Sequence, residues 1–207
     1  MDICIVFVIM TLTLPKAFQK APIQRMRDLE LLGLSRPRVR SLVDQGILEK
    51  ASRGLYIVRS AGVTENRTLA EVGKRVPHGV ICLLSALRFH DLTTQSPHEV
   101  WIALERSAWS PKLEHLNLRI VRFSSRAFEE GHQEHMLEGV SVKITSPAKT
   151  IADCFKYRNK IGLDVALEAL REVRRKRLCT MEDLTHFAHI CRVANVMKPY
   201  LESLVAS

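Results

Sequence analysis

Seven of the side chains between residues 36 and 53 are candidates for contact with double-stranded DNA, because their chemical types suit it. Arginine and lysine bind phosphate oxygens, and arginine, glutamine and serine can also hydrogen-bond the edges of base pairs. We expect one set to read base pairs in the major groove and a second set to bind phosphates. The groove set is Arg38, Arg40, Ser41 and Gln45, and the phosphate set is Arg36, Lys50 and Arg53.

The surrounding sequence predicts two helices joined by a tight turn. Residues 25–33 carry apolar side chains at helical spacing and end on a glycine. Ser35 can cap a second helix, Pro37 fits its first turn, and Gly46 can end it. In that second helix Val39 and Leu42 would pack inward, which leaves the polar side chains on the outer face.

A hairpin is predicted directly after the second helix. Two short β-rich runs, 47–50 and 55–58, flank a four-residue connection that contains Gly54. Lys50 and Arg53 would lie at its tip. The order helix, turn, helix and hairpin is that of a winged helix-turn-helix, whose second helix enters the major groove.

The charge of the chain favours a nucleic-acid partner. Lys and Arg number 31 and Asp and Glu 22, which gives +9, and the isoelectric point is near 9.6. Residues 25–59 hold eight of the cations and four of the acids. Nearly half of the net positive charge therefore coincides with the predicted winged helix.

The remainder of the chain predicts an α+β fold. We expect a polar helical bridge at 63–76 and a buried helix at 80–89. Strands are expected at 98–104, 118–123 and 140–144, and helices near 147–158, 162–176, 181–191 and 195–205. Thr180 and Asp183 would start the third of these helices with a capping box. The predicted domains are 1–60, a winged helix-turn-helix, and 61–207, a mixed α+β domain with a helical end.

The segment 145–158 leaves two interpretations open. Its helix N-terminus could hold a phosphate beside Lys149 and Thr150. The favoured interpretation is a capped helix that packs Ile151 and Phe155 inward.

A second basic face is also a candidate for DNA contact, with a solvated helix end as the alternative. Its residues are Lys149, Lys156, Arg158, Lys160, Arg174, Arg175 and Arg177.

Catalysis is not expected. Metal-dependent nucleases and nucleotidyltransferases hold their cations with closely placed carboxylates. The acids of the second region form no such pair, and its histidines lack a nucleophile or third partner; these residues are Glu99, Glu105, Glu129 and Glu130, and His90, His132 and His135. The sequence therefore predicts no enzyme, no cofactor and no metal site.

The cysteines and the first residues bear on location. Five cysteines without a CxxC pair favour a reducing compartment, and so the cytoplasm. The apolar run 3–14 is shorter than the roughly 20 residues that span a bilayer, so no membrane association is expected. We expect the leader 1–14 to be a first helix or the product of an over-called start codon, with Met10 or Met26 as later starts.

Several phrases resemble the AbiEi family of antitoxins. The Arg-rich helix followed by Gly54-Leu-Tyr resembles the family's N-terminal domain. The stretches Cys82-Leu-Leu-Ser-Ala-Leu, Ser146-Pro-Ala-Lys-Thr-Ile-Ala-Asp-Cys-Phe and Ile161-Gly-Leu-Asp-Val-Ala-Leu-Glu-Ala-Leu resemble its C-terminal region. Together these matches reach from about residue 25 to 205.

The resemblance implies a type IV toxin–antitoxin system. In that family the antitoxin represses its own promoter through the winged helix. It counters a co-encoded nucleotidyltransferase-like toxin through the C-terminal domain, without a stable complex. Two other functions stay open: a module that sequesters a partner protein and uses the winged helix as a scaffold, and a transcriptional regulator that has no toxin partner.

Overall fold

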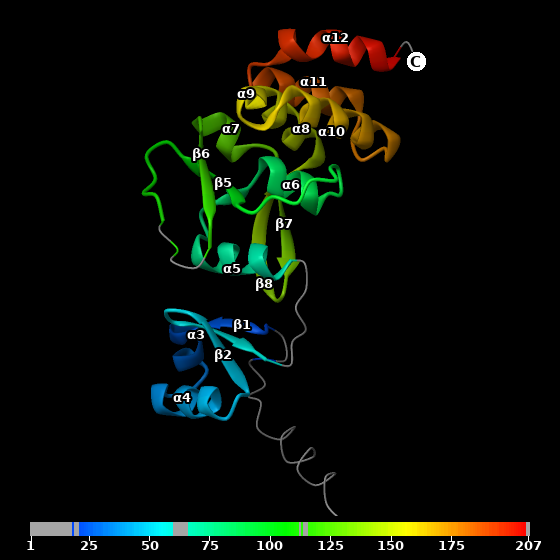
Figure 1. The fold of residues 1–207 in the computed structure, drawn as a ribbon. Helices are drawn as coiled ribbons and strands as arrows, with labels where there is room; N and C mark the ends of the chain where they lie inside the picture. Colours follow the sequence, from blue (N-terminus) through cyan, green and yellow to red (C-terminus); the bar gives the residue numbers. More distant parts are fainter. Residues whose placement is uncertain (1–17, 19–20, 60–65, 112, 114–115, 206–207) are drawn as a thin grey trace, which may run out of the picture. The chain divides into compact units, whose positions relative to one another are not determined.

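The structure, a computed structural model, describes residues 18, 21–59, 66–111, 113 and 116–205 (Figure 1). By its internal contacts the chain divides into two compact units. The first comprises Met1–Lys74 with Met136–Ser141, and the second Arg75–His135 with Val142–Ser207. The predicted leader 1–14 and the predicted boundary at residue 60 lie outside the described residues. Within the described part of the chain, no helix is long and apolar enough to cross a membrane.

The first unit contains the predicted helix pair and hairpin. Helices α3 (Met26–Leu31) and α4 (Arg36–Asp44) precede strands β2 (Leu48–Ser52) and β3 (Leu55–Val58), and α5 (Arg67–Arg75) follows. The hairpin is part of a three-stranded antiparallel sheet of order β1-β3-β2. Strand β1 (Ile23–Arg25) was not predicted from the sequence, because its three residues form a strand only through pairing with β3.

An apolar cluster joins these elements. Val39 and Leu42 of α4 are buried together with Leu29 of α3 and with Leu48 and Val58 of the hairpin. The helical spacing of the apolar residues within 25–33 suggests that Leu32 lies on the same face as Met26 and Leu29, but α3 ends at Leu31 and 56% of Leu32 is exposed. The cluster holds α4 against both α3 and the sheet.

The second unit is built on a five-stranded mixed sheet of order β6-β5-β4-β8-β7. Strands β5 (Val100–Glu105) and β6 (Leu118–Phe123) run parallel, β4 (Val80–Ile81) is antiparallel to β5 and parallel to β8 (Val140–Thr145), and β7 (His132–Leu137) forms the other edge. The start of the helix predicted at 80–89 is wrong. Its first two residues pair in the sheet, and only the remainder forms α6 (Leu83–Phe89). The α+β class is confirmed.

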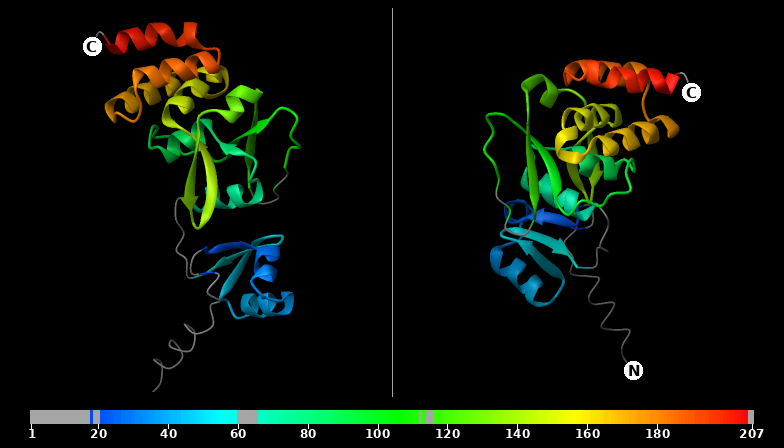
Figure 2. Two further views of the ribbon diagram at one scale, coloured as in Figure 1. Left: turned by 180° about the vertical axis from the view of Figure 1, so that it is seen from behind. Right: turned by 45° about the horizontal axis from the view of Figure 1, so that its top comes forward.

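Helices form the end of the chain and stack beside this sheet (Figure 2). They are α8 (Pro147–Lys156), α9 (Arg158–Ile161), α10 (Leu163–Arg175), α11 (Met181–Ile190) and α12 (Ala194–Val205). A further short helix, α7 (Ser125–Glu129), lies between β6 and β7 in the sequence. Helix α8 is the centre of this arrangement, because it contacts α6, α10, α11 and α12. The capping box at Thr180 and Asp183 is confirmed, since both of its reciprocal hydrogen bonds are present.

A buried ion pair lies on α8. The Lys149 ammonium donates to both carboxylate oxygens of Asp153 at 2.6 Å and lies 4.4 Å from the centre of the Phe123 ring. The Cys191 thiol donates to the same carboxylate at 3.2 Å. Burial raises the pKa of Asp153 above its ordinary value, and the charge of Lys149 opposes that shift. Lys149 is completely buried, so its assignment to a surface basic face is wrong.

The start of α8 is the capped helix that was favoured. The Ser146 hydroxyl accepts a hydrogen bond from the Lys149 backbone N–H. The buried Thr150 hydroxyl donates to the Ser146 carbonyl oxygen at 2.8 Å. The phosphate-site interpretation is wrong, because Lys149 and Thr150 both point into the protein and have internal partners.

We predict that Lys149→Met lowers the free energy of unfolding by about 3–5 kcal/mol, because it leaves the Asp153 carboxyl buried without its partner. Lys149→Met/Asp153→Leu should recover most of that loss. Urea unfolding followed by circular dichroism measures both. Arg126→Met, which breaks the exposed pair Arg126–Glu130 at the same i, i+4 spacing, is the control and should change little. Equal losses for Lys149→Met and Arg126→Met would contradict a stabilising role for the buried pair.

Two cap positions give a second prediction. The Thr180 hydroxyl accepts the Asp183 N–H at 3.0 Å, whereas Ser35, at the N-cap of α4, makes no side-chain cap hydrogen bond. Thr180→Ala should therefore lower the free energy of unfolding by about 1 kcal/mol, and Ser35→Ala should lower it by much less. The same urea titration compares the two variants, and a larger effect at Ser35 would show that its capping role has been misjudged.

Candidate nucleic-acid interface

Helix α4 and the β2–β3 hairpin position all seven predicted DNA-contacting residues. Pro37 lies in the first turn of α4, where its missing N–H leaves no helical hydrogen bond unmade. Gly46 ends the helix with φ +71°, a conformation that glycine adopts without strain. The nine residues of α4 form one short helix that presents the arginines.

The rotation of α4 separates its polar side chains into two faces. At about 100° per residue, Arg36 and Arg40 lie on the same side as Asp44. Arg38, Ser41 and Gln45 lie on the opposite flank. Between the two flanks on the inner side is the buried stripe of Val39 and Leu42.

A hollow of about 700 Å³ lies where the first of these faces meets the hairpin. Four cations of the predicted set line it: Arg36 and Arg40 from α4, and Lys50 and Arg53 from the hairpin. Tyr56 and the Asp44 carboxylate also line it. The sequence placed Arg40 with the groove-reading residues, but in the structure it faces the phosphate set.

Arg36 is already paired. Its guanidinium donates to the Glu30 carboxylate at 2.8 Å, and this hydrogen bond raises the pKa of Arg36 above its ordinary value. Glu30 belongs to α3, across the turn. Because Glu30 offsets one positive charge, Arg40, Lys50 and Arg53 supply most of the free positive charge at the hollow.

The hairpin connection is shorter than predicted. Strand β2 continues to Ser52 through an irregularity in its pairing between Lys50 and Ser52, so only Arg53 and Gly54 form the turn. Gly54 has φ +72°. The exposed side chains of Lys50 and Arg53 both remain at the open end of the wing.

The second face of α4 carries a side-chain hydrogen bond. The Gln45 amide N–H donates to the Ser41 hydroxyl oxygen at 2.8 Å, one helical turn apart. Arg38 is exposed on the same flank. Arg38 forms no ion pair within the residues that the structure describes.

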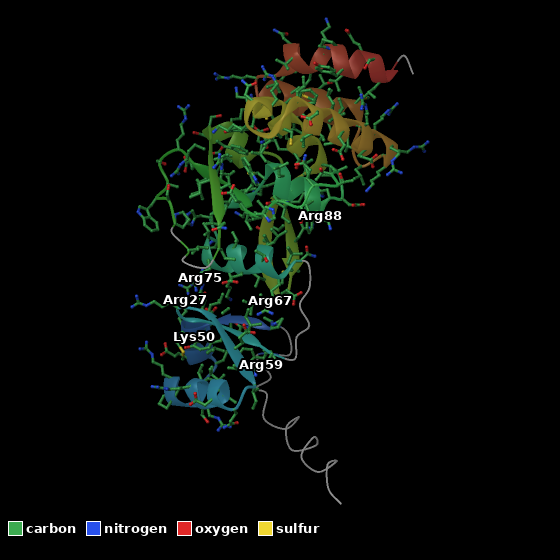
Figure 3. The ribbon with its side chains drawn as sticks, in the orientation of Figure 1. Arg27, Lys50, Arg59, Arg67, Arg75 and Arg88 are labelled. Carbon is green, nitrogen blue, oxygen red and sulfur yellow. The ribbon has the colours of Figure 1, made fainter. Side chains whose placement is uncertain are left out.

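Arg59 is a cation that the sequence analysis did not assign to DNA contact. It follows β3 directly, and its guanidinium lies beside Gly46 at the end of α4 (Figure 3). The sequence could not predict this position of Arg59, because the contact with Gly46 depends on the packing of α4 against the sheet. Other cations of this unit have acidic partners: Arg67 pairs with Glu49 at 3.3 Å.

The second basic face is only partly assembled. Arg174, Arg175 and Arg177 line one hollow of about 940 Å³ in the second unit, at the end of α10. Arg175 is paired there with Glu172 at 2.6 Å. The remaining residues are not in this lining: Lys156 is exposed at the end of α8, Arg158 donates to the Phe155 carbonyl, and Lys160 lies over the Tyr157 ring. Lys149 is buried, as described above.

The histidines of the second unit form aromatic contacts. Phe89 packs edge-on against His90 and His135, and the His90 ring nitrogen lies 2.7 Å from the Thr145 carbonyl oxygen. Burial lowers the pKa of His90. In the described ranges, no three histidine, cysteine or acidic side chains are grouped so that they could hold a metal ion.

Comparisons with known proteins give two findings. The chain shares its fold with the crystal structure of the RV2827C protein from Mycobacterium tuberculosis, with a TM-score of 0.55, 13% identity, and coverage of 83% of this chain and 67% of that chain. A search of curated proteins found no match. Residues 17–59, which hold α3, α4 and the hairpin, match the family described as the transcriptional regulator, AbiEi antitoxin. Over these residues the chain is similar to the AbiEi family of antitoxin transcriptional regulators.

Proposed function

We propose that this protein is a DNA-binding transcriptional autorepressor and the antitoxin of a type IV toxin–antitoxin system. One observation carries the proposal. Arg36, Arg40, Lys50 and Arg53 surround a single hollow between a short exposed helix and a hairpin. That arrangement lies within the segment that matches the antitoxin regulator family. It acts by binding and not by catalysis.

In the proposed complex α4 enters the major groove and the wing lies along the backbone. Lys50, Arg53 and Arg40 bind phosphates, and each of these contacts releases condensed counterions. Arg36 joins them as a cation shared with Glu30. Arg38, Ser41 and Gln45 face the base pairs from the other flank of α4. The duplex bound is the protein's own promoter.

The antitoxin role is assigned to the second unit, acting in the cytoplasm. It counters a co-encoded nucleotidyltransferase-like toxin without forming a stable complex. The family that residues 17–59 match is described as an antitoxin, which supports an antitoxin role for the chain as a whole. We also propose that Arg174, Arg175 and Arg177 give the second unit a weaker phosphate-contacting surface.

Lys50→Ala should weaken binding to all DNA sequences alike and reduce the slope of log K against log salt concentration by about one, because one phosphate contact is lost. Fluorescence anisotropy with the promoter duplex and a shuffled duplex, over a range of salt concentrations, measures the slope. Lys198→Ala is the matched control, since Lys198 is an exposed lysine of the second unit outside both hollows. An unchanged slope for Lys50→Ala would show that Lys50 in the wing does not contact the DNA.

Glu30→Gln tests the shared cation. The substitution keeps the shape of the side chain but frees Arg36 and removes a negative charge near the DNA. It should tighten binding to promoter and shuffled duplexes by similar factors and steepen the salt dependence. The effect should be smaller when Arg36 is replaced by alanine as well, because only the loss of the Glu30 charge then contributes. Weaker binding of Glu30→Gln would instead show that the Glu30–Arg36 pair holds α4 in its binding geometry.

A further inference from the structure

The hydrogen bond between Ser41 and Gln45 fixes the direction of an exposed amide. Gln45 uses one N–H on the Ser41 hydroxyl at 2.8 Å. An amide nitrogen has two hydrogens, so the other N–H and the carbonyl oxygen remain as a donor and acceptor pair. The hydrogen directed away from the carbonyl is the one that Ser41 can take without covering that pair. Ser41 then leaves uncovered the edge that carries the carbonyl oxygen and the other N–H, which is the free edge of the amide.

The free edge matches one base in the major groove. Adenine presents the N7 acceptor and the N6 donor side by side, and glutamine binds both at once. An α-helix with its side chains is about 10–12 Å across, so the roughly 12 Å wide major groove admits α4 along its length of about 13 Å. Gln45 at its end and Arg38 near its start can therefore both reach base edges.

Arg38 complements this amide. It is exposed on the same flank as Ser41 and Gln45, and α4 carries no acid on that flank. An arginine of this kind binds the O6 and N7 acceptors of guanine. Arg38 and Gln45 are seven positions apart, about 10 Å along the helix, which corresponds to the rise of about three base pairs.

We infer that Gln45, oriented by Ser41, reads an adenine, and that Arg38 reads a guanine within about three base pairs of it. The inference rests on the proposed function and adds the sequence that it selects. The opposite face of α4, with the wing, then supplies phosphate contacts that are independent of sequence. Ser41 is a positioning residue, because it acts through the amide of Gln45.

The first experiment selects bound duplexes from a library with 20 randomised base pairs, using the full-length chain. The wild type should enrich a site that contains the guanine and the adenine. Gln45→Ala should lose the preference at the adenine alone, by about 5- to 150-fold, and Arg38→Ala should lose it at the guanine by a similar factor. Gln45→Glu should shift the preference from adenine to cytosine, whose N4 amino group donates to a carboxylate. Gln133→Ala, which removes an exposed glutamine of β7, is the control and should keep the full preference.

A base analogue gives an independent reading. Replacing the selected adenine with 7-deazaadenine removes the N7 acceptor, so it should weaken the wild type but not Gln45→Ala. Ser41→Ala should lose part of the adenine preference, and Ser41→Thr should keep it. The inference is overturned if Gln45→Ala retains the adenine preference, or if 7-deazaadenine weakens both proteins equally. A wild type that enriches no site at all would contradict the proposed function itself.

Discussion

The burial of one apolar stripe on α4 decides how the whole interface is arranged. Val39 and Leu42 are almost completely inaccessible among Leu29, Leu48 and Val58. Burying a side chain of this size contributes about 1.5–3 kcal/mol, so rotating the helix to present another face would expose side chains at a large cost. With its rotation fixed, α4 can present only two polar flanks. One faces the wing and the other faces away from it.

The two flanks have different physical characters. The flank beside the wing gathers guanidinium and ammonium groups around one hollow, and acids at Glu30 and Asp44 moderate its charge. Such an arrangement suits the DNA backbone, whose charge is the same at every sequence. The other flank carries Ser41 and Gln45, neutral groups whose hydrogen bonds have direction. Directional groups are the ones that distinguish one base pair from another.

The buried pair of Lys149 and Asp153 shows why some cations could not be assigned from the sequence. A lysine and an aspartate four residues apart form the same pattern on an exposed helix face and inside a protein core. Only the packing of α6, α10, α11 and α12 around α8 distinguishes the two cases. The pairing of Arg36 with Glu30 was not predicted for a similar reason, because it crosses a turn whose geometry the sequence does not specify. Helix α4, its end at Gly46 and the capping box at Thr180 were predictable, since local side-chain chemistry determines them. The two- and three-residue strands β4 and β1 were missed, because partner strands determine them.

The proposed function requires that the winged helix binds promoter DNA by sequence. The most direct measurement is an anisotropy titration of the full-length protein with a duplex from its own upstream region and with a shuffled duplex of equal composition, each at two salt concentrations. We predict tighter binding to the upstream duplex at both salt concentrations, with both affinities falling as salt rises. Equal and weak binding to the two duplexes would contradict it, and would show that the basic charge of this protein serves only non-specific contact.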